Sequence, residues 1–411
     1  MKELKGNANL SVGLLYLIWP FLVLVESIRN YRESWAKNGI WLFVIFFAFT
    51  FVPRSGNDSM GMAERLTEFH NADLSLSQVL GMVYTHGSRY LDVIQLLITF
   101  LVSKFSNDYR ILFGIFGVLF GFFYSRNIWS LITATEGKLG TVEIILLLLF
   151  SLLIPMWYIN GVRFWTAAHI FIYGALQVLL YKNTRGYLIG ALSILMHFSY
   201  VFPVVLLGAY LVIGNRTRIY FAFFIVSLII SGLDPILVRD TLLNYAPDIL
   251  HNRISSYTNL DEIERGRLAY ANANFYARWY LGAIKIGISS LLILVFLAGK
   301  EYWKEKNVIN LYSFALFFTG FTNLTSTVSS MGRFSHVANL VSVASMFMFY
   351  YALPRTHSSR KWFYLATPFL VFYAFTMVRL AMDNTGVLAF ISNPIFAPFL
   401  ANKLALIDLI R

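Results

Sequence analysis

Five ionisable side chains lie at the ends of long apolar stretches or within them, where they could act on a ligand. Asp58 comes just after one such stretch, Arg163, Arg278 and Arg333 each begin one, and His197 lies deep within one. An ionisable group held at the edge of hydrocarbon is costly, so it is retained mainly where it pairs, faces a polar cavity or binds a ligand. These residues are therefore the first candidates for chemistry.

The arginines and the acid–base groups predict different roles. A guanidinium presents a planar set of donors that suits phosphate oxygens. Arg163, Arg278 and Arg333 have little acid near them in the sequence, which predicts a site for a lipid diphosphate. A histidine side chain ordinarily titrates near neutral pH, so His197 is a candidate general base. Asp58 is the rival base, or the group that orients a sugar hydroxyl.

Four further polar residues could contact a substrate: Arg54, Asn57, Asn160 and His336. The last of these is spaced i, i+3 from Arg333, which places both on one helix face. Every candidate also has a structural interpretation. Asp58 would cap the helix that follows it, the arginines would anchor to lipid headgroups, and the histidines would form packing hydrogen bonds. The residues alone leave both interpretations open.

Composition places these residues in an all-α polytopic membrane protein. The chain has 411 residues, of which 58% are hydrophobic and only 13% are charged, against about 25% charged in soluble domains. The absence of cysteine excludes disulfides and thiolate chemistry. The net charge of +12 comes from Lys and Arg in short loops between apolar stretches, which is typical of membrane proteins, so we expect no nucleic-acid partner.

Apolar stretches long enough to approach the thickness of a bilayer predict about 12–14 transmembrane helices in a single membrane-embedded domain over residues 1–411. The predicted spans are Leu10–Ile28, Gly39–Pro53, Arg110–Tyr124, Thr141–Tyr158, Arg163–Tyr181, Tyr187–Val201, Phe202–Gly214, Ile219–Leu233, Arg278–Leu297, Val308–Ser326, Arg333–Leu353, Trp362–Arg379 and a weak Val387–Leu404.

Basic loops fix the orientation of these spans, because Lys and Arg gather on the cytoplasmic side. All the strongly basic loops fall on one side if Tyr90–Lys104, which is short, lies in the interface or re-enters instead of crossing. The opposite face then receives two long loops, residues 54–109 and 234–277. The first contains a predicted amphipathic surface helix after Asp58. We expect both loops to be ordered and functional.

Other chemistries lack their motifs. The sequence has no aspartate pair typical of a metal–nucleotide-sugar site, no phosphate-binding glycine loop and no dinucleotide turn. It has no cluster of metal ligands and no serine nucleophile elbow. We therefore expect neither a metal nor a cofactor.

The stretch NGVRFWTAAHIFIYGALQVLLYKNTRGYLIGALSILMHFSYVFPVVLL resembles the central block of the EpsG-like, Wzy-type polysaccharide polymerases. In that family an Asn/Gly–X–Arg turn precedes a span, a basic loop and a second span that ends in a Phe-His or similar pair. Arg163 and His197 match the turn and the pair, although Met196 here precedes the histidine. SSMGRFSHVANL resembles the later arginine-containing span and matches Arg333, and Gly56-Asn57-Asp58 resembles the first outer loop.

The resemblance implies a membrane glycosyltransferase with a GT-C-like architecture. Such polymerases join oligosaccharide repeat units carried on undecaprenyl diphosphate at the periplasmic face of the bacterial inner membrane, and build O-antigen, capsule or exopolysaccharide. The implied mechanism is inverting and metal-independent. It also implies a lipid-linked donor and acceptor as substrates, with a chain-length regulator and a flippase as possible partners in the bilayer.

Alternatives remain within and outside this class. An O-antigen ligase, or a transferase that uses a polyprenyl-phosphate sugar, would share the architecture and would use Asp58 as its base. A flippase for lipid-linked oligosaccharides would show internal repeats, and the sequence shows none. A glycan acyltransferase would also use arginine and histidine.

Overall fold

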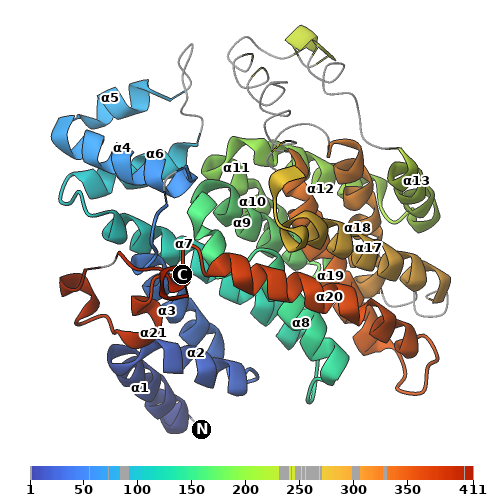
Figure 1. Ribbon diagram of the computed structural model, residues 1–411. Helices are drawn as coiled ribbons and strands as arrows, with labels where there is room; N and C mark the ends of the chain where they lie inside the picture. Colours follow the sequence, from blue (N-terminus) through green and yellow to red (C-terminus); the bar gives the residue numbers. More distant parts are fainter. Residues whose placement is uncertain are drawn as a thin grey trace.

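The computed structural model describes residues 2–54, 56–72, 74–83, 92–230, 271–298, 306–326, 331–401 and 403–410, with short pieces between residues 240 and 268. Most of these residues are helical, and the only β pairing between two of them is an isolated bridge between Gly386 and Ala405. The helices run as α1 Lys2–Ile18, α2 Pro20–Arg29, α3 Ala36–Phe49, α4 Asp58–Ala72, α5 Leu76–Gly81, α6 Val93–Ser103, α7 Tyr109–Thr133, α8 Thr141–Leu153, α9 Val162–Leu179, α10 Arg185–Ala191, α11 Ser193–Met196, α12 Val201–Ile213, α13 Thr217–Ile229, α17 Phe275–Ala298, α18 Lys306–Leu324, α19 Phe334–Ala352, α20 Arg360–Ala381 and α21 Leu388–Ile391, with 3-10 turns η1 Met156–Gly161, η2 Phe198–Tyr200, η4 Met331–Arg333, η5 Ala397–Phe399 and η6 Leu406–Leu409 (Figure 1).

The protein is a helical membrane protein, as its composition predicts. Four helical stretches in the described ranges are long and apolar enough to cross a bilayer: Tyr109–Thr133, Thr141–Leu179, Phe275–Ala298 and Arg360–Ala381. Shorter apolar helices, among them α3, α12 and α13, pack around them. By contrast, α6 has 11 residues and so rises only about 16 Å, which is too short for a hydrocarbon core of about 30 Å.

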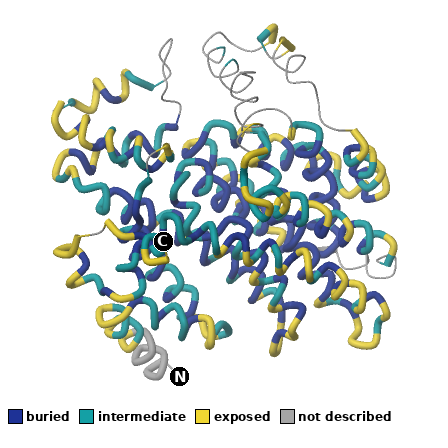
Figure 2. The backbone as a smooth tube through the Cα atoms, viewed as in Figure 1, coloured by how far each residue is buried: buried dark blue, intermediate teal, exposed yellow. Residues whose placement is uncertain are grey.

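A continuous apolar core joins these helices. It is centred on α19, which packs against α7, α8, α9, α17 and α18 and is buried along most of its length (Figure 2). One buried polar side chain inside it is His169, whose Nε2 lies 3.1 Å from the carbonyl of Ile154 and whose own carbonyl accepts from Asn127. His169 is thus a packing histidine.

Helices α4, α5 and α6 form a smaller unit at the upper left of Figure 1. Residues 59, 62, 66 and 69 of α4 are buried, a spacing that gives this helix one buried face. Phe69 packs with Val79, Leu96 and Phe100 in a separate small core. The unit therefore holds the start of α4, and with it Asp58, in a defined position.

Turns predicted to share one side of the membrane do lie together. Arg32 donates to the carbonyl of Thr135, the hydroxyl of Tyr351 accepts from the amide of Glu136, and Arg360 binds Glu143 at 3.2 Å. The turns after α2, α7 and α19 thus meet at one end, in the lower part of Figure 1. The two long loops leave from the opposite end, and residues 84–91 and most of 231–270 lie outside the described part of the chain.

Three sequence predictions about helices are wrong. The weak span Val387–Leu404 contains only the short α21 and η5, because Pro394 and Pro398 interrupt a helix. The predicted span Leu10–Ile28 breaks at Trp19, and Pro20 begins α2. His197 does not lie deep in a span: it has extended backbone angles (φ −152°, ψ 115°) between α11 and η2, at the turn of an antiparallel pair formed with α12.

Candidate functional site

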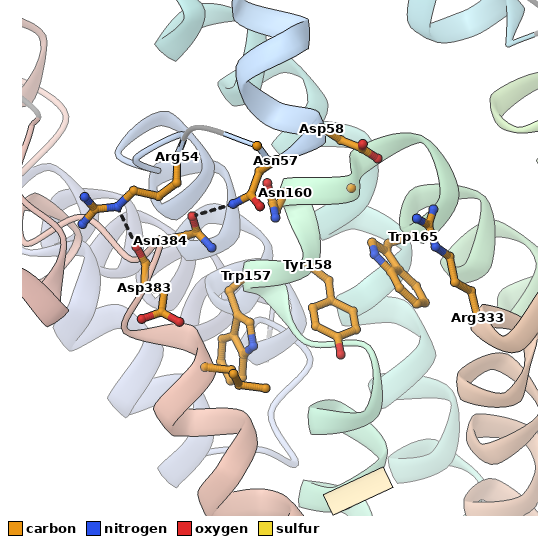
Figure 3. Close-up of a pocket in the computed structure, with 13 residues that line it drawn as sticks. Arg54, Asn57, Asp58, Trp157, Tyr158, Asn160, Trp165, Arg333, Asp383 and Asn384 are labelled. Atoms are coloured by element: carbon orange, nitrogen blue, oxygen red, sulfur yellow. Dashed lines mark hydrogen bonds between the residues drawn. The ribbon is translucent and has the colours of Figure 1, made fainter. Parts of the chain in front are cut away.

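A cavity of about 590 Å³ opens at the end of the helices from which the long loops leave. Its polar lining comes from segments far apart in the sequence: Arg54, Asn57, Asp58, Asn160, Arg333, Asp383 and Asn384. The carboxylate of Asp383 is bound to Arg379 at 3.0 Å. Figure 3 shows Arg54 and Asn384 on one side of the cavity, Arg333 on the other, and Asp58 above. Five residues proposed from the sequence therefore face one space.

Aromatic rings form one wall of this cavity. Trp157 and Tyr158 come from η1, and Trp165 lies one turn into α9 (Figure 3). The rings of Tyr158 and Trp165 are tilted against each other, 4.6 Å between centroids. The buried indole Nε1 of Trp157 has no hydrogen-bond partner within the described structure. Ring faces beside amide and carboxylate groups suit a polar ligand with apolar faces, such as a sugar.

The segment from Arg54 to Asn57 is held by the C-terminal part of the chain. Arg54 donates through Nε to the carbonyl of Asp383 at 3.0 Å, and its terminal nitrogen forms a salt bridge with Asp408 at 2.5 Å. Asn57 donates to the side chain of Asn384 (Figure 3). Gly56 has φ +84°, a conformation that favours glycine, and this turn directs the chain into α4.

Asp58 begins α4 and lies beside both the main cavity and a neighbouring cavity of about 410 Å³. The next residue, Ser59, donates to Asn160 at 2.6 Å and so ties α4 to η1. Asp58 is exposed and forms no salt bridge with any described residue. Its carboxylate is therefore available to a ligand. Because Asp58 is the first residue of α4, its negative charge also interacts favourably with the positive end of the helix dipole.

Arg163 lines the neighbouring cavity, and it is neutralised. Its guanidinium binds Asp92 at 3.0 Å, and the other oxygen of Asp92 accepts from the backbone amide of Phe198 at 3.0 Å. Asp92 thus joins α9 to the turn that follows His197. The expected absence of nearby acid is therefore incorrect for Arg163. Arg54 also has an acidic partner, Asp408.

His197 helps to form this turn. Its Nδ1 accepts from the backbone amide of Ser199 at 3.3 Å and lies 2.8 Å from the hydroxyl of the same residue. Its ring lies edge-on to Phe164 at 5.3 Å and is not among the groups that line the main cavity. Arg333, by contrast, is exposed and lines the main cavity. Its guanidinium carbon lies 5.8 Å from the centre of the Phe164 ring.

The remaining candidates lie outside the main cavity. His336 is behind its aromatic wall, with ring centroids 6.0 Å from Tyr158 and 5.6 Å from Trp165. Arg278, in the first turn of α17, is half-buried and does not line the cavity. The structure therefore brings together Arg54, Asn57, Asp58, Asn160 and Arg333, places Arg163 next to them, and separates them from His197, His336 and Arg278.

Sequence reasoning missed the aromatic wall and the residues that hold the site. Trp157 and Trp165 flank the NGVR turn, and this proximity was a usable signal. Asp92 and Asp383 lie in segments with no distinctive pattern. Only the fold shows that the carboxylate of Asp92 binds Arg163 and that the backbone carbonyl of Asp383 binds Arg54.

No known protein family, curated protein or solved structure matches this chain.

Proposed function

We propose that this protein is a membrane glycosyltransferase that joins oligosaccharide repeat units carried on a polyprenyl diphosphate. One observation carries the proposal: Asp58 and Arg333 share an aromatic-walled cavity of about 590 Å³ at one end of the helices. This volume is typical of a site for a small molecule or a few sugar rings. A carboxylate, a guanidinium and ring faces are the groups that glycosyl transfer from a diphosphate needs.

In the proposed reaction Asp58 is the general base. Its carboxylate takes the proton of an acceptor hydroxyl, whose oxygen attacks the anomeric carbon of the donor sugar. The bond between that carbon and the diphosphate oxygen breaks, and the electron pair leaves with the diphosphate. Arg333 stabilises the negative charge that develops on the leaving group. Attack from the face opposite the diphosphate inverts the anomeric centre.

An apolar groove supports a lipid-linked substrate. It has a volume of about 420 Å³, is lined mainly by leucine and isoleucine from α2, α7 and α8, and extends from Tyr31 to Trp157. Trp157 also lines the polar cavity, so the two spaces share a residue. A prenyl chain in the groove would place its diphosphate near the unpartnered indole Nε1 of Trp157.

The remaining parts of the proposal follow the resemblance. The architecture would be GT-C-like with about 12–14 spans, and the cavity would face the periplasm at the bacterial inner membrane. The lipid would be undecaprenyl diphosphate, and the product would be O-antigen, capsule or exopolysaccharide. A chain-length regulator and a flippase would be its partners, and no cofactor would be needed.

A gel of surface glycan from a strain that lacks this gene tests the proposal. We expect a single repeat unit in place of a ladder, and the ladder should return with the wild-type gene. A ladder that persists without the gene, with altered acylation or a missing branch sugar, would contradict polymerase activity and favour a glycan-modifying enzyme.

A further inference from the structure

Lys285 is a charged residue in the middle of an apolar helix. It lies ten residues after Phe275, the start of α17, and thirteen before Ala298, its end, which places it about 15 Å and 20 Å from the two ends. The aromatic pair Trp279 and Tyr280, typical of a membrane interface, lies less than two turns before it. A lysine at such a depth marks a binding or transport site more often than a packing position.

Lys285 lies at a second cavity, of about 170 Å³, between α17, α18 and α19. Polar side chains from all three helices line it: Ser289, Thr322, Asn323, Ser335 and Asn339. On α18, residues 319, 322 and 323 form one polar face of an apolar helix, and Ser326 follows in the turn after it. The polar residues of α17, α18 and α19 thus face one another in this cavity. Packing of apolar helix surfaces alone does not explain such an arrangement in a membrane protein.

Several of these groups have unused hydrogen-bonding capacity. Thr322 donates to a carbonyl of its own helix, and Asn323 donates to Ser227. In contrast, the hydrogen bonds found among the described residues include none from the side chains of Lys285, Ser335 or Asn339. Nδ1 of His336, which also lines this cavity, is buried without a partner.

The charge of the cavity indicates its ligand. Lys285 is the only Lys, Arg, Asp or Glu residue among the described residues that line it, and it forms no salt bridge with any of them. Lys285 is exposed at the edge of this cavity. An ammonium group beside hydroxyl and amide groups favours an anion with several acceptor oxygens. The volume is below the roughly 300–1,000 Å³ of sites for drug-sized ligands, so a single small anionic group fits.

We propose that this cavity binds one phosphate group, with Lys285 as its charged partner and Ser335 and Asn339 as neutral donors. The site is separate from the main cavity and does not rest on the proposed transferase activity. The two spaces share a wall, because His336 lines this cavity while its ring packs against Tyr158 and Trp165 of the other. The phosphate belongs either to a lipid headgroup that enters from the bilayer or to free inorganic phosphate.

Titration calorimetry on the purified protein in detergent tests the site. The probes are dihexanoyl phosphatidic acid, dihexanoyl phosphatidylcholine and sodium phosphate. We expect the wild type to bind phosphatidic acid at least about tenfold more tightly than phosphatidylcholine. Lys285→Met should remove this preference, Lys285→Arg should keep most of it, and Asn339→Leu should weaken it. Equal binding of phosphatidic acid and sodium phosphate would support the phosphate site and identify free phosphate as the ligand.

Lys138→Met is the matched control, since Lys138 is an exposed lysine in the turn before α8. It should bind every probe as the wild type does. Size-exclusion profiles and thermal unfolding of each variant separate lost binding from lost folding. The proposal is overturned if folded Lys285→Met keeps the preference for phosphatidic acid, or if the wild type binds neither phosphatidic acid nor sodium phosphate.

Discussion

Asp58 and Arg333 carry opposite charges into one cavity without forming a salt bridge with each other or with another described residue. A charged group in a salt bridge must break that bridge, at a cost in free energy, before it can bind a substrate. Within the described part of the chain, Asp58 and Arg333 have no such bridge to break. His197, by contrast, uses Nδ1 to hold the turn before α12. At the scale of single residues the geometry therefore favours Asp58 as the base and gives His197 a role in positioning.

Arg333 should matter most among the three arginines assigned to the diphosphate. Arg163 is bound to Asp92, and Arg278 lies outside the main cavity. We expect Arg333→Ala to lower kcat by about 10²–10³-fold, as the loss of one transition-state donor does. Arg333→Lys should lower kcat less than Arg333→Ala does, because lysine keeps the positive charge but lacks the planar set of donors of a guanidinium. Steady-state kinetics of chain extension measure both variants.

The control for Arg333 is Arg355→Ala, an exposed arginine in the turn between α19 and α20. We expect the kcat of Arg355→Ala to stay within about twofold of the wild-type value, because substitutions at exposed sites away from the cavity and the core usually have small effects. Unchanged kcat in Arg333→Ala would remove Arg333 from the proposed reaction.

Asp92 should stabilise the fold through two partners. Asp92→Ala leaves both the Arg163 guanidinium and the Phe198 amide without an acceptor, whereas Asp92→Asn still offers an oxygen to the amide. We expect Asp92→Ala to cost about 1–3 kcal/mol, as the loss of the acceptor of a buried hydrogen-bonding group does, and Asp92→Asn to cost less. Thermal or denaturant unfolding in detergent checks the order. The double variant Asp92→Asn, Arg163→Met should be more stable than Asp92→Asn alone, because it removes the arginine charge that has lost its partner.

At the scale of elements, the α9–α10 pair positions two segments that flank the site, the start of α9 and the turn at His197. Gly174 on α9 faces Gly186 and Gly190 on α10 so closely that a Cβ at Gly174 would lie 2.4 Å from the amide nitrogen of Gly190. Small residues allow helices in membranes to approach in this way. The pair carries Arg163 at the start of α9 and leads through α11 to His197.

Two substitutions within this helix contact should differ sharply. Gly174→Ala forces the helices apart, and we expect a loss of about 1–3 kcal/mol, as overpacking usually gives. A Cβ at Gly190 would have its nearest neighbour at 3.8 Å, so Gly190→Ala should be neutral or slightly stabilising. Unfolding in detergent compares the two, and equal stability of both variants would contradict the close approach.

At the scale of the whole molecule, the sequence predicts the helical membrane class, most helix positions and the grouping of loops, because each depends on local composition and charge. It does not predict the turn at His197, since apolar residues continue on both sides of it. It also misses contacts such as Arg54 with Asp408 and Arg163 with Asp92, which join residues distant in the chain. The cavity is likewise visible only once Asp58 and Arg333 are placed together by the fold.

The orientation of the whole molecule can be measured directly, because the chain contains no cysteine and single-cysteine variants will react at one position. We expect Glu68→Cys on α4 to react with a membrane-impermeant maleimide in intact spheroplasts. Lys138→Cys, in the turn before α8 at the opposite end, should react only after the membrane is permeabilised. Both positions are exposed. The reverse pattern would place the main cavity on the cytoplasmic side.

The most direct test of the account is chain extension by purified protein in liposomes, supplied with a lipid-diphosphate-linked repeat unit. We predict that wild type forms a ladder of products, that Asp58→Asn forms none while remaining folded, and that Glu68→Gln, an exposed acid on the same helix, behaves as wild type. A normal ladder from Asp58→Asn would contradict the assignment of Asp58 as the base. A wild-type protein that forms no ladder would contradict the proposed transferase itself.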